Sequence, residues 1–501
     1  MSKAADTLKE LGEALCTELG FLPTSNSTKP LYIANGLFRE STGRTCELRD
    51  VHKWVVSERR TKAAPSRELL KEFADVFRDS EAEKPEVLQE VRFYFERVFN
   101  PDSTVYPSYD KSVMNISSKW LVHRYRLAEA EIGSFLFGIL NEPIGGKPSP
   151  VLDILRTALA QQDDDITRLI KPLIVREPEE TRIKPVRITQ NPLKPTATAM
   201  NESKLKIRAG FDRLANNIIL LGQTEDSLLV LRRLVCFASF AVFFYLEDIN
   251  HTEFSEPQIP LLLDAGLGLG AIESASSGSF LSCKKAVETY TINFLEKHLT
   301  GYDGIYISDI NSKQAVEGYI RQASFHHKKI DTEEIRGVIL QHFNGYCGKG
   351  DAPIRAIARA LQFALYTYTY PNNTPSDFCN VLGKRGGLAG PAGSAAKQVR
   401  LLIHRFALEN LILSSIEPER LQEGIELREI GDCLRKAYSV IIGTDTDLDY
   451  ALLAEAKIAQ DTPENLRSEL SQNAQGIADM LISLGLAKRY ADGVTIIEVG
   501  A

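Results

Sequence analysis

The chain has 501 residues, of which 44% are hydrophobic and 25% are charged, and its formal net charge is −7. This composition excludes a fibrous or intrinsically disordered chain, and the acidic balance argues against a nucleic-acid binder that is basic over its whole surface. At roughly 100–200 residues per domain, the length predicts several domains. A local basic patch is still compatible with an acidic total, since phosphate binding depends on clustered charge.

Cysteine usage and hydropathy predict a cytoplasmic protein with no metal site and no cofactor. The seven cysteines contain no Cys-x-x-Cys pair and their number is odd, which argues against a zinc ribbon or a disulfide framework. The longest uncharged apolar run, 234–246, has thirteen residues. A bilayer needs about 18, so this run predicts a buried core helix and no membrane partner.

The N-terminal region, residues 1–142, is predicted to be a helical domain. Leucines recur at helical spacing from Leu8 to Leu19 with acids between them, so this start is an amphipathic helix and not a signal peptide. Further apolar stripes predict helices over 67–77, 87–98 and 116–140.

Three regions follow in the middle of the chain. Residues 143–203 are predicted to be a proline-rich connection with a short helix over 151–159 and a candidate edge strand near 186–189, since proline removes a ladder donor. Residues 204–300 are predicted to be an apolar helical core domain. Residues 301–415 are predicted to be a mixed, mostly helical region, with helices near 313–323, 332–343 and 352–366.

Residues 416–501 carry the clearest local pattern. Pro463, with Asp461 or Thr462 as its cap, begins an apolar-periodic helix that stops near Gly485. An Asp492-Gly493 pair between two β-prone runs is a strong hairpin signal. Upstream helices over 424–438 and 447–457 complete the layout of a winged-helix-like module.

The predicted fold class is therefore mainly α and multi-domain, with helical N-terminal and central domains and a C-terminal winged-helix-like module that contains a small β-hairpin. A DNA-reading module places basic and amide side chains on its helix and wing. Here we expect Arg467, Lys488 and Arg489 to contact nucleic acid. Winged helices also bind proteins, and neighbouring acids offset the charge of these three cations. Both DNA and protein therefore remain open as the partner of this module.

A basic, glycine-rich segment precedes this module. No acid lies between 381 and 405, and Ser394 is expected to cap a helix that carries Lys397, Arg400 and Leu401. Backbone N–H groups at a helix start attract phosphate when cations lie nearby. The segment is not a P-loop, because it lacks the Gly-Lys-[Ser/Thr] ending, and a flexible loop with solvated charge is the alternative. The predicted nucleic-acid contacts here are Lys384, Arg385, Lys397, Arg400 and Arg405.

Residues 383–499 resemble a known class of protein. The basic Gly-Gly-Leu loop is followed by Leu434-Arg-Lys-Ala-Tyr438-Ser-Val-Ile-Ile-Gly443, by Leu484-Gly-Leu and by Ala491-Asp-Gly-Val. This order is similar to the tail of large accessory subunits encoded in prokaryotic anti-phage DNA-defence operons. The resemblance implies a non-catalytic DNA-binding or DNA-positioning subunit, with other subunits of a defence complex and double-stranded DNA as partners.

Two other hypotheses stay open. The chain is a protein scaffold without DNA contact, or it is a nuclease-type enzyme with an unfamiliar site. Glu455 and Lys457, with acids upstream, have the spacing of a nuclease Glu-x-Lys pair. We expect a helix there, which would turn the two side chains away from a shared metal.

Overall fold

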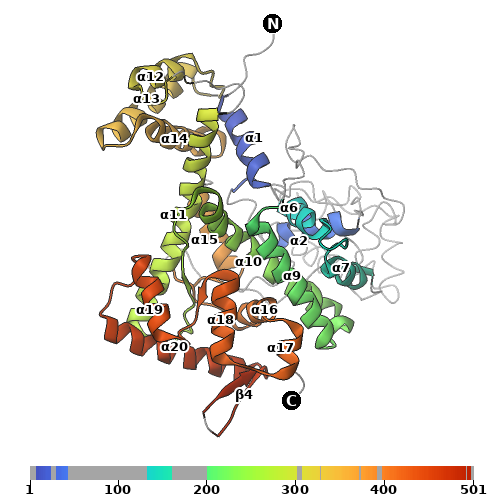
Figure 1. Cartoon of the computed structure of the whole chain (residues 1–501). Helices are drawn as coiled ribbons and strands as arrows, with labels where there is room; N and C mark the ends of the chain where they lie inside the picture. Colours follow the sequence, from blue (N-terminus) through green and yellow to red (C-terminus); the bar gives the residue numbers. More distant parts are fainter. Residues whose placement is uncertain are drawn as a thin grey trace, which may run out of the picture.

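The computed structural model describes residues 7–23, 30–42, 132–160, 200–301, 307, 309–327, 329–371, 374–391, 398–491 and 493–497. Over these residues the protein is mainly helical, which confirms the predicted class (Figure 1). Some predicted elements lie outside the described residues: the helices over 67–77 and 87–98, the first part of the helix over 116–140, and the edge strand near 186–189.

The described α-helices are α1 (Thr7–Leu19), α2 (Pro30–Thr42), α6 (Ile132–Asn141), α7 (Pro150–Ala160), α9 (Glu202–Leu220), α10 (Ser227–Phe254), α11 (Gly270–Gly301), α12 (Lys313–Gln322), α13 (Thr332–Gly348), α14 (Pro353–Ala364), α15 (Pro375–Arg385), α16 (Arg405–Ser415), α17 (Pro418–Glu423), α18 (Leu427–Tyr438), α19 (Thr446–Glu455) and α20 (Pro463–Ser483).

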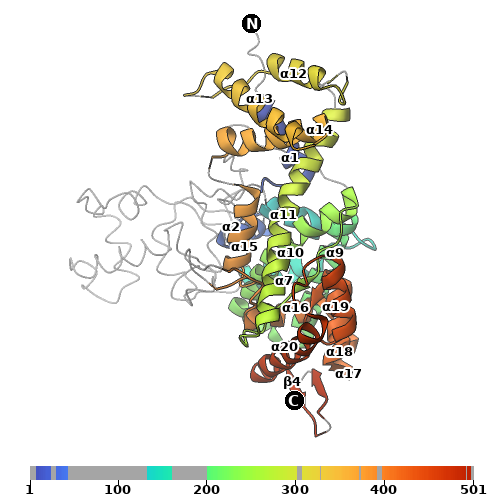
Figure 2. The ribbon, with the colours of Figure 1, turned by 90° about the vertical axis from the view of Figure 1, so that its left-hand side faces the viewer.

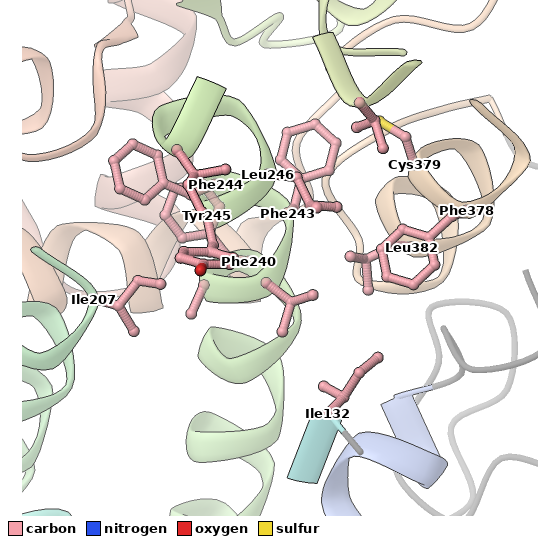
Figure 3. Packing of buried hydrophobic residues seen from close by; sticks show 14 of the residues in the cluster. Ile132, Ile207, Phe240, Phe243, Phe244, Tyr245, Leu246, Phe378, Cys379 and Leu382 are labelled. Atoms are coloured by element: carbon pink, nitrogen blue, oxygen red, sulfur yellow. The ribbon is translucent and has the colours of Figure 1, made fainter. Parts of the chain in front are cut away.

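Helix α10 forms the centre of the molecule and confirms the predicted buried helix. It contacts α2, α7, α9, α11, α15 and α16, so it is covered on several sides. Phe243, Phe244 and Tyr245 are fully buried, and Phe378 and Leu382 of α15 approach the same helix (Figure 3). Among the described helices only Leu229–Phe254 is long and apolar enough to cross a membrane, and 83% of its apolar window is buried inside the protein. Between Val230 and Asn250 every side chain except Arg232 and Cys236 is buried, so this stretch lacks the polar face of a surface helix.

The hydrophobic core extends along the chain. One cluster of buried side chains includes Leu8 of α1, Leu152 of α7, Leu411 of α16 and Ile497 near the C-terminal end. Described helices from all five predicted regions therefore pack into a shared core. The boundaries of those regions remain predictions.

Two small sheets are present in the described part of the chain. Strand β1 (Leu261–Leu262) pairs in parallel with β3 (Val440–Ile441), which ties the centre of the chain to its C-terminal part. The second sheet is antiparallel, in the order β2-β5-β4. Its strands are β2 (Ile425–Glu426), β4 (Ala487–Arg489) and β5 (Thr495–Ile497).

The C-terminal elements follow their sequence signals. Thr462 caps α20 by accepting a hydrogen bond from the Asn465 N–H, and Pro463 occupies the first turn. Gly485 (φ +71°) lies just beyond the end of α20, and Gly493 (φ +85°) lies in the β4–β5 turn. Both backbones are left-handed, a conformation that glycine adopts without steric cost. The hairpin and the helix before it are thus confirmed as elements.

Helices α12, α13 and α14 project from the body. We call these three helices the arm. In two perpendicular views the arm lies at one end of the molecule and the β4–β5 hairpin at the other (Figures 1 and 2). The predicted helices over 313–323, 332–343 and 352–366 are confirmed. Helix α13 extends beyond its predicted end to Gly348.

Glu247 is a buried carboxyl in the second half of α10. Its side chain lies beside the Cys283 thiol of α11. Burial raises the pKa of Glu247 from 4.5 to about 8, because the charged form loses its hydration. The folded pKa lies above the unfolded one. This group's contribution to stability is therefore fully present below pH 4.5 and is lost as pH rises through about 8.

We expect Glu247→Gln to remove this pH dependence. The amide has nearly the shape of the protonated acid and carries no charge at any pH. Its free energy of unfolding should exceed that of the natural chain by roughly 3–5 kcal/mol at about pH 9, and by less than about 1 kcal/mol at about pH 5. Denaturant unfolding at both pH values measures this difference. Glu464→Gln, on the exposed start of α20, is the control, and parallel pH profiles for all three proteins would refute the prediction.

Candidate nucleic-acid interface

Backbone hydrogen bonds between the described ends of the basic segment hold it as a closed loop. Gly390 and Arg400 exchange two backbone hydrogen bonds of 2.9 Å, and the His404 N–H donates to the Gly387 carbonyl at 3.1 Å. These bonds hold the end of α15 beside the start of α16. The structure thereby brings together Lys384 and Arg385, in the last turn of α15, with Arg405, the first residue of α16.

The predicted helix through Lys397, Arg400 and Leu401 is wrong at the two residues that the structure describes. Residues 398–404 are not helical, and Lys397 lies outside the described residues. The backbone here is bonded to other partners. Arg400 pairs with Gly390, and the Leu401 N–H donates to the Ser276 hydroxyl at 2.9 Å. Such tertiary bonds replace the local bonds that a helix would need.

Arg400 is held in a partly buried ion-pair network. Its guanidinium pairs with Asp264, whose side chain is 1% exposed, and with Glu273 at 2.7 Å. Two carboxylates therefore neutralise this cation. It joins the end of β1 to the first turn of α11, and its charge contributes little to an exposed phosphate site.

His404 is the N-terminal cap of α16. The His404 Nδ1 accepts a hydrogen bond from the Phe406 N–H at 3.1 Å, so this side chain caps the helix. Burial, and then the neighbouring Arg405 charge, lower the pKa of His404 to about 4. The imidazole is therefore neutral near neutral pH, and its ring nitrogen can accept this bond.

A further cation, on α10, lies beside the start of α16. The guanidinium of Arg232 lies 4.2 Å from the centroid of the Phe406 ring. We call Lys384, Arg385, Arg405 and Arg232 the loop-base cluster. Sequence analysis did not single out Arg232, since it lies far from the basic segment in the chain and has no motif of its own. The neighbouring Arg233 is buried and pairs with Glu409 of α16. Its guanidinium lies 5.5 Å from the Phe406 ring centroid, farther than that of Arg232.

The predicted cations of the C-terminal module lie on α20 and β4, and not on the helices that carry the loop-base cluster. Arg467 pairs with Asp447 at 2.9 Å and lies over the Tyr450 ring. Arg489 of β4 pairs with Asp479 of α20 at 2.7 Å. Lys488 is exposed on the same strand. Carboxylates therefore partly neutralise Arg467 and Arg489.

The exposed face of α20 is polar and rich in amide and hydroxyl groups. Its exposed side chains include Asn465, Ser468, Ser471, Gln472 and Gln475.

Other polar side chains of α20 are buried and structural. Asn473, with a side chain that suits base reading, donates to the carbonyls of Leu263 and Ile442 at 2.8 and 3.1 Å. Glu469 accepts hydrogen bonds from the backbone N–H groups of Ala271 and Ile272 at the start of α11. These bonds fasten α20 to the centre of the molecule.

The residues considered for metal or nuclease chemistry do not gather into a site. Within the described ranges, no group of three His, Cys, Asp or Glu side chains is placed to hold a metal ion. Helix α19 ends at Glu455, and Lys457 follows in a left-handed turn (φ +57°). The pair therefore does not lie on a strand with both side chains toward one point.

Comparison with known proteins gives no relative from which a role could be transferred. The chain matches no family model, no curated protein and no solved structure.

We expect substitutions of Arg400 and Arg405 to have very different effects on the free energy of unfolding. Arg400→Ala removes the cation beside the buried Asp264 carboxylate and should lower the free energy of unfolding by about 3–5 kcal/mol. Arg405→Gln removes an exposed charge and should change it by less than about 0.5 kcal/mol. Urea unfolding of the full chain measures both. Equal unfolding midpoints for the two variants would show that the Arg400 network does not stabilise the fold.

Proposed function

We propose that the chain is a non-catalytic DNA-binding or DNA-positioning subunit of a multi-protein prokaryotic anti-phage defence complex. The observation that carries the DNA contact is the C-terminal arrangement: a three-stranded sheet, β2-β5-β4, beside α20, with the β4–β5 hairpin projecting from one end of the molecule (Figure 2). This is the arrangement expected of a winged-helix-like module. The defence assignment rests on the resemblance of residues 383–499.

In this proposal α20 is the helix that enters the major groove. Its exposed amides, Gln472 and Gln475, have the donor and acceptor groups that pair with base edges. The hairpin lies beside it, where Lys488 and the 44% exposed Tyr490 contact the sugar–phosphate backbone. The loop-base cluster supplies a second, sequence-independent phosphate contact.

The pairing of the module's cations makes this contact weak and only moderately sensitive to salt. Each phosphate that a cation neutralises contributes about −0.9 to the slope of log K against log salt. With Arg467 and Arg489 held by Asp447 and Asp479, two or three effective cations give a slope of about −2 to −3. A positioning subunit held in place by protein partners needs no tighter contact than this.

A protein scaffold is the second candidate, and the same ion pairs favour it. A face whose charges are already balanced loses less by burial against another protein than a bare cationic face does. In that case the hairpin and α20 bind a protein partner, and the chain contacts no DNA.

We expect the full chain to bind a labelled duplex at low salt, and the variant carrying Lys488→Gln and Tyr490→Ala to bind more weakly. Removing one phosphate-contacting lysine should reduce the salt slope by about 1. Fluorescence anisotropy across a salt series measures the affinity and the slope together.

The matched control is Lys285→Gln, which removes an exposed lysine of α11 away from the hairpin. Its slope should equal that of the natural chain. No duplex binding at low salt would reject DNA contact and favour the scaffold, whereas binding that Lys488→Gln and Tyr490→Ala leave unchanged would reject the hairpin as the contact.

A further inference from the structure

The arm carries a set of aromatic and cationic side chains, of which Phe363 is exposed and the others are half-buried. His342 of α13 and Phe363 of α14 stack with ring centroids 3.8 Å apart and an interplanar angle of 26°. One turn further along, the guanidinium of Arg359 lies 4.1 Å from the centroid of the Tyr346 ring. We call these four residues the stacking face.

The geometry of two packed helices produces this face. His342 and Tyr346 are four residues apart on α13, as are Arg359 and Phe363 on α14, so each pair lies on one side of its helix. The opposite side of α14 fills the core with Ala356, Ala360 and Ala364, all fully buried. The stacking face is therefore the side of α14 that the core does not use.

Phe363 is partly exposed at the surface of the arm. It is 38% exposed, so part of its ring is open to a ligand. Here the ring also has a histidine ring on one side, so a flat group placed beside the pair would extend an existing stack.

The stacking face has a lysine beside its rings. Residues 332–364 contain four Lys or Arg and three Asp or Glu, within a chain whose net charge is −7. At the stacking face Lys349 lies 5.9 Å from the Tyr346 ring centroid, and Arg359 is balanced by Asp351 at 2.6 Å. The face thus combines flat rings with a cation, and its own acid is already paired.

We propose that the stacking face binds unpaired bases of a single-stranded nucleic acid. Every base has a π-face that stacks on an aromatic ring, and Lys349 beside the Tyr346 ring can pair with a backbone phosphate. An acidic peptide would match the charge but has few flat groups to stack. This inference does not depend on the hairpin or on α20, which lie at the other end of the molecule (Figure 2).

The test uses the full chain and two fluorescent probes of equal length: a single-stranded oligothymidine and an abasic oligonucleotide with the same backbone. Phe363→Leu keeps an apolar side chain and removes the ring, and His342→Ala removes its stacking partner. Each variant should bind oligothymidine roughly tenfold more weakly. Neither variant should change binding of the abasic probe, since that probe has no base to stack.

Two controls separate stacking from other effects. Arg321→Gln removes an exposed cation of α12 and should leave the preference for oligothymidine over the abasic probe unchanged. The thermal midpoint of Phe363→Leu shows whether the variant is folded, and Phe363→Tyr, which keeps an aromatic ring, should restore binding.

Three results would overturn the proposal: no binding of oligothymidine by the natural chain, equal affinity for the two probes, or the same affinity in Phe363→Leu as in the natural chain. Competition by polyglutamate as strong as that by oligothymidine would also overturn it, in favour of an acidic protein partner. None of these outcomes affects the duplex measurements with Lys488→Gln. Single-strand binding by the stacking face and duplex binding by the hairpin can therefore be rejected independently.

Discussion

The 28-residue helix α10 has an almost unbroken apolar surface, and covering that surface takes helices from both ends of the chain. Full burial of each large apolar side chain contributes roughly 1.5–3 kcal/mol, so leaving any side of this helix in water would be costly. The N-terminal α2, the central α11 and the late α16 all meet on it. The parallel pairing of β1 with β3 follows from the same requirement, because it closes the C-terminal part of the chain over the core.

Arginines fix the positions of helices around this core. Arg208 is 2% exposed and donates to the carbonyls of Ile139 and Glu142, where α6 ends. Arg233 joins α10 to α16, and Arg400 joins the closed loop to α11. Such pairs remove cations from the surface. The number of basic residues in a segment is therefore a poor guide to the charge that a ligand meets.

Local signals predicted much of the fold. The spacing of leucines in α1, the apolar run of α10, the capped start of α20 and the Asp-Gly hairpin each depend on neighbouring residues. The candidate site could be predicted only in part. That Arg400 is paired, that Asn473 is buried and that Arg232 meets Phe406 all depend on contacts between residues far apart in the chain. The stacking face was not predicted for the same reason, since its rings come from two different helices. Strands β1, β2 and β3 were not predicted either, because a strand of two residues has no periodicity to detect.

Helix α11 connects the two ends of the molecule. It contacts α20 near its start and α14 of the arm farther along, and its first turn is fastened to α20 through Glu469. Its 32 residues correspond to a rod about 48 Å long. A continuous helix resists bending, so the hairpin end and the arm are kept at a nearly constant separation. For a nucleic acid bound at both ends as proposed, the length of α11 corresponds to about 14 base pairs of B-form duplex.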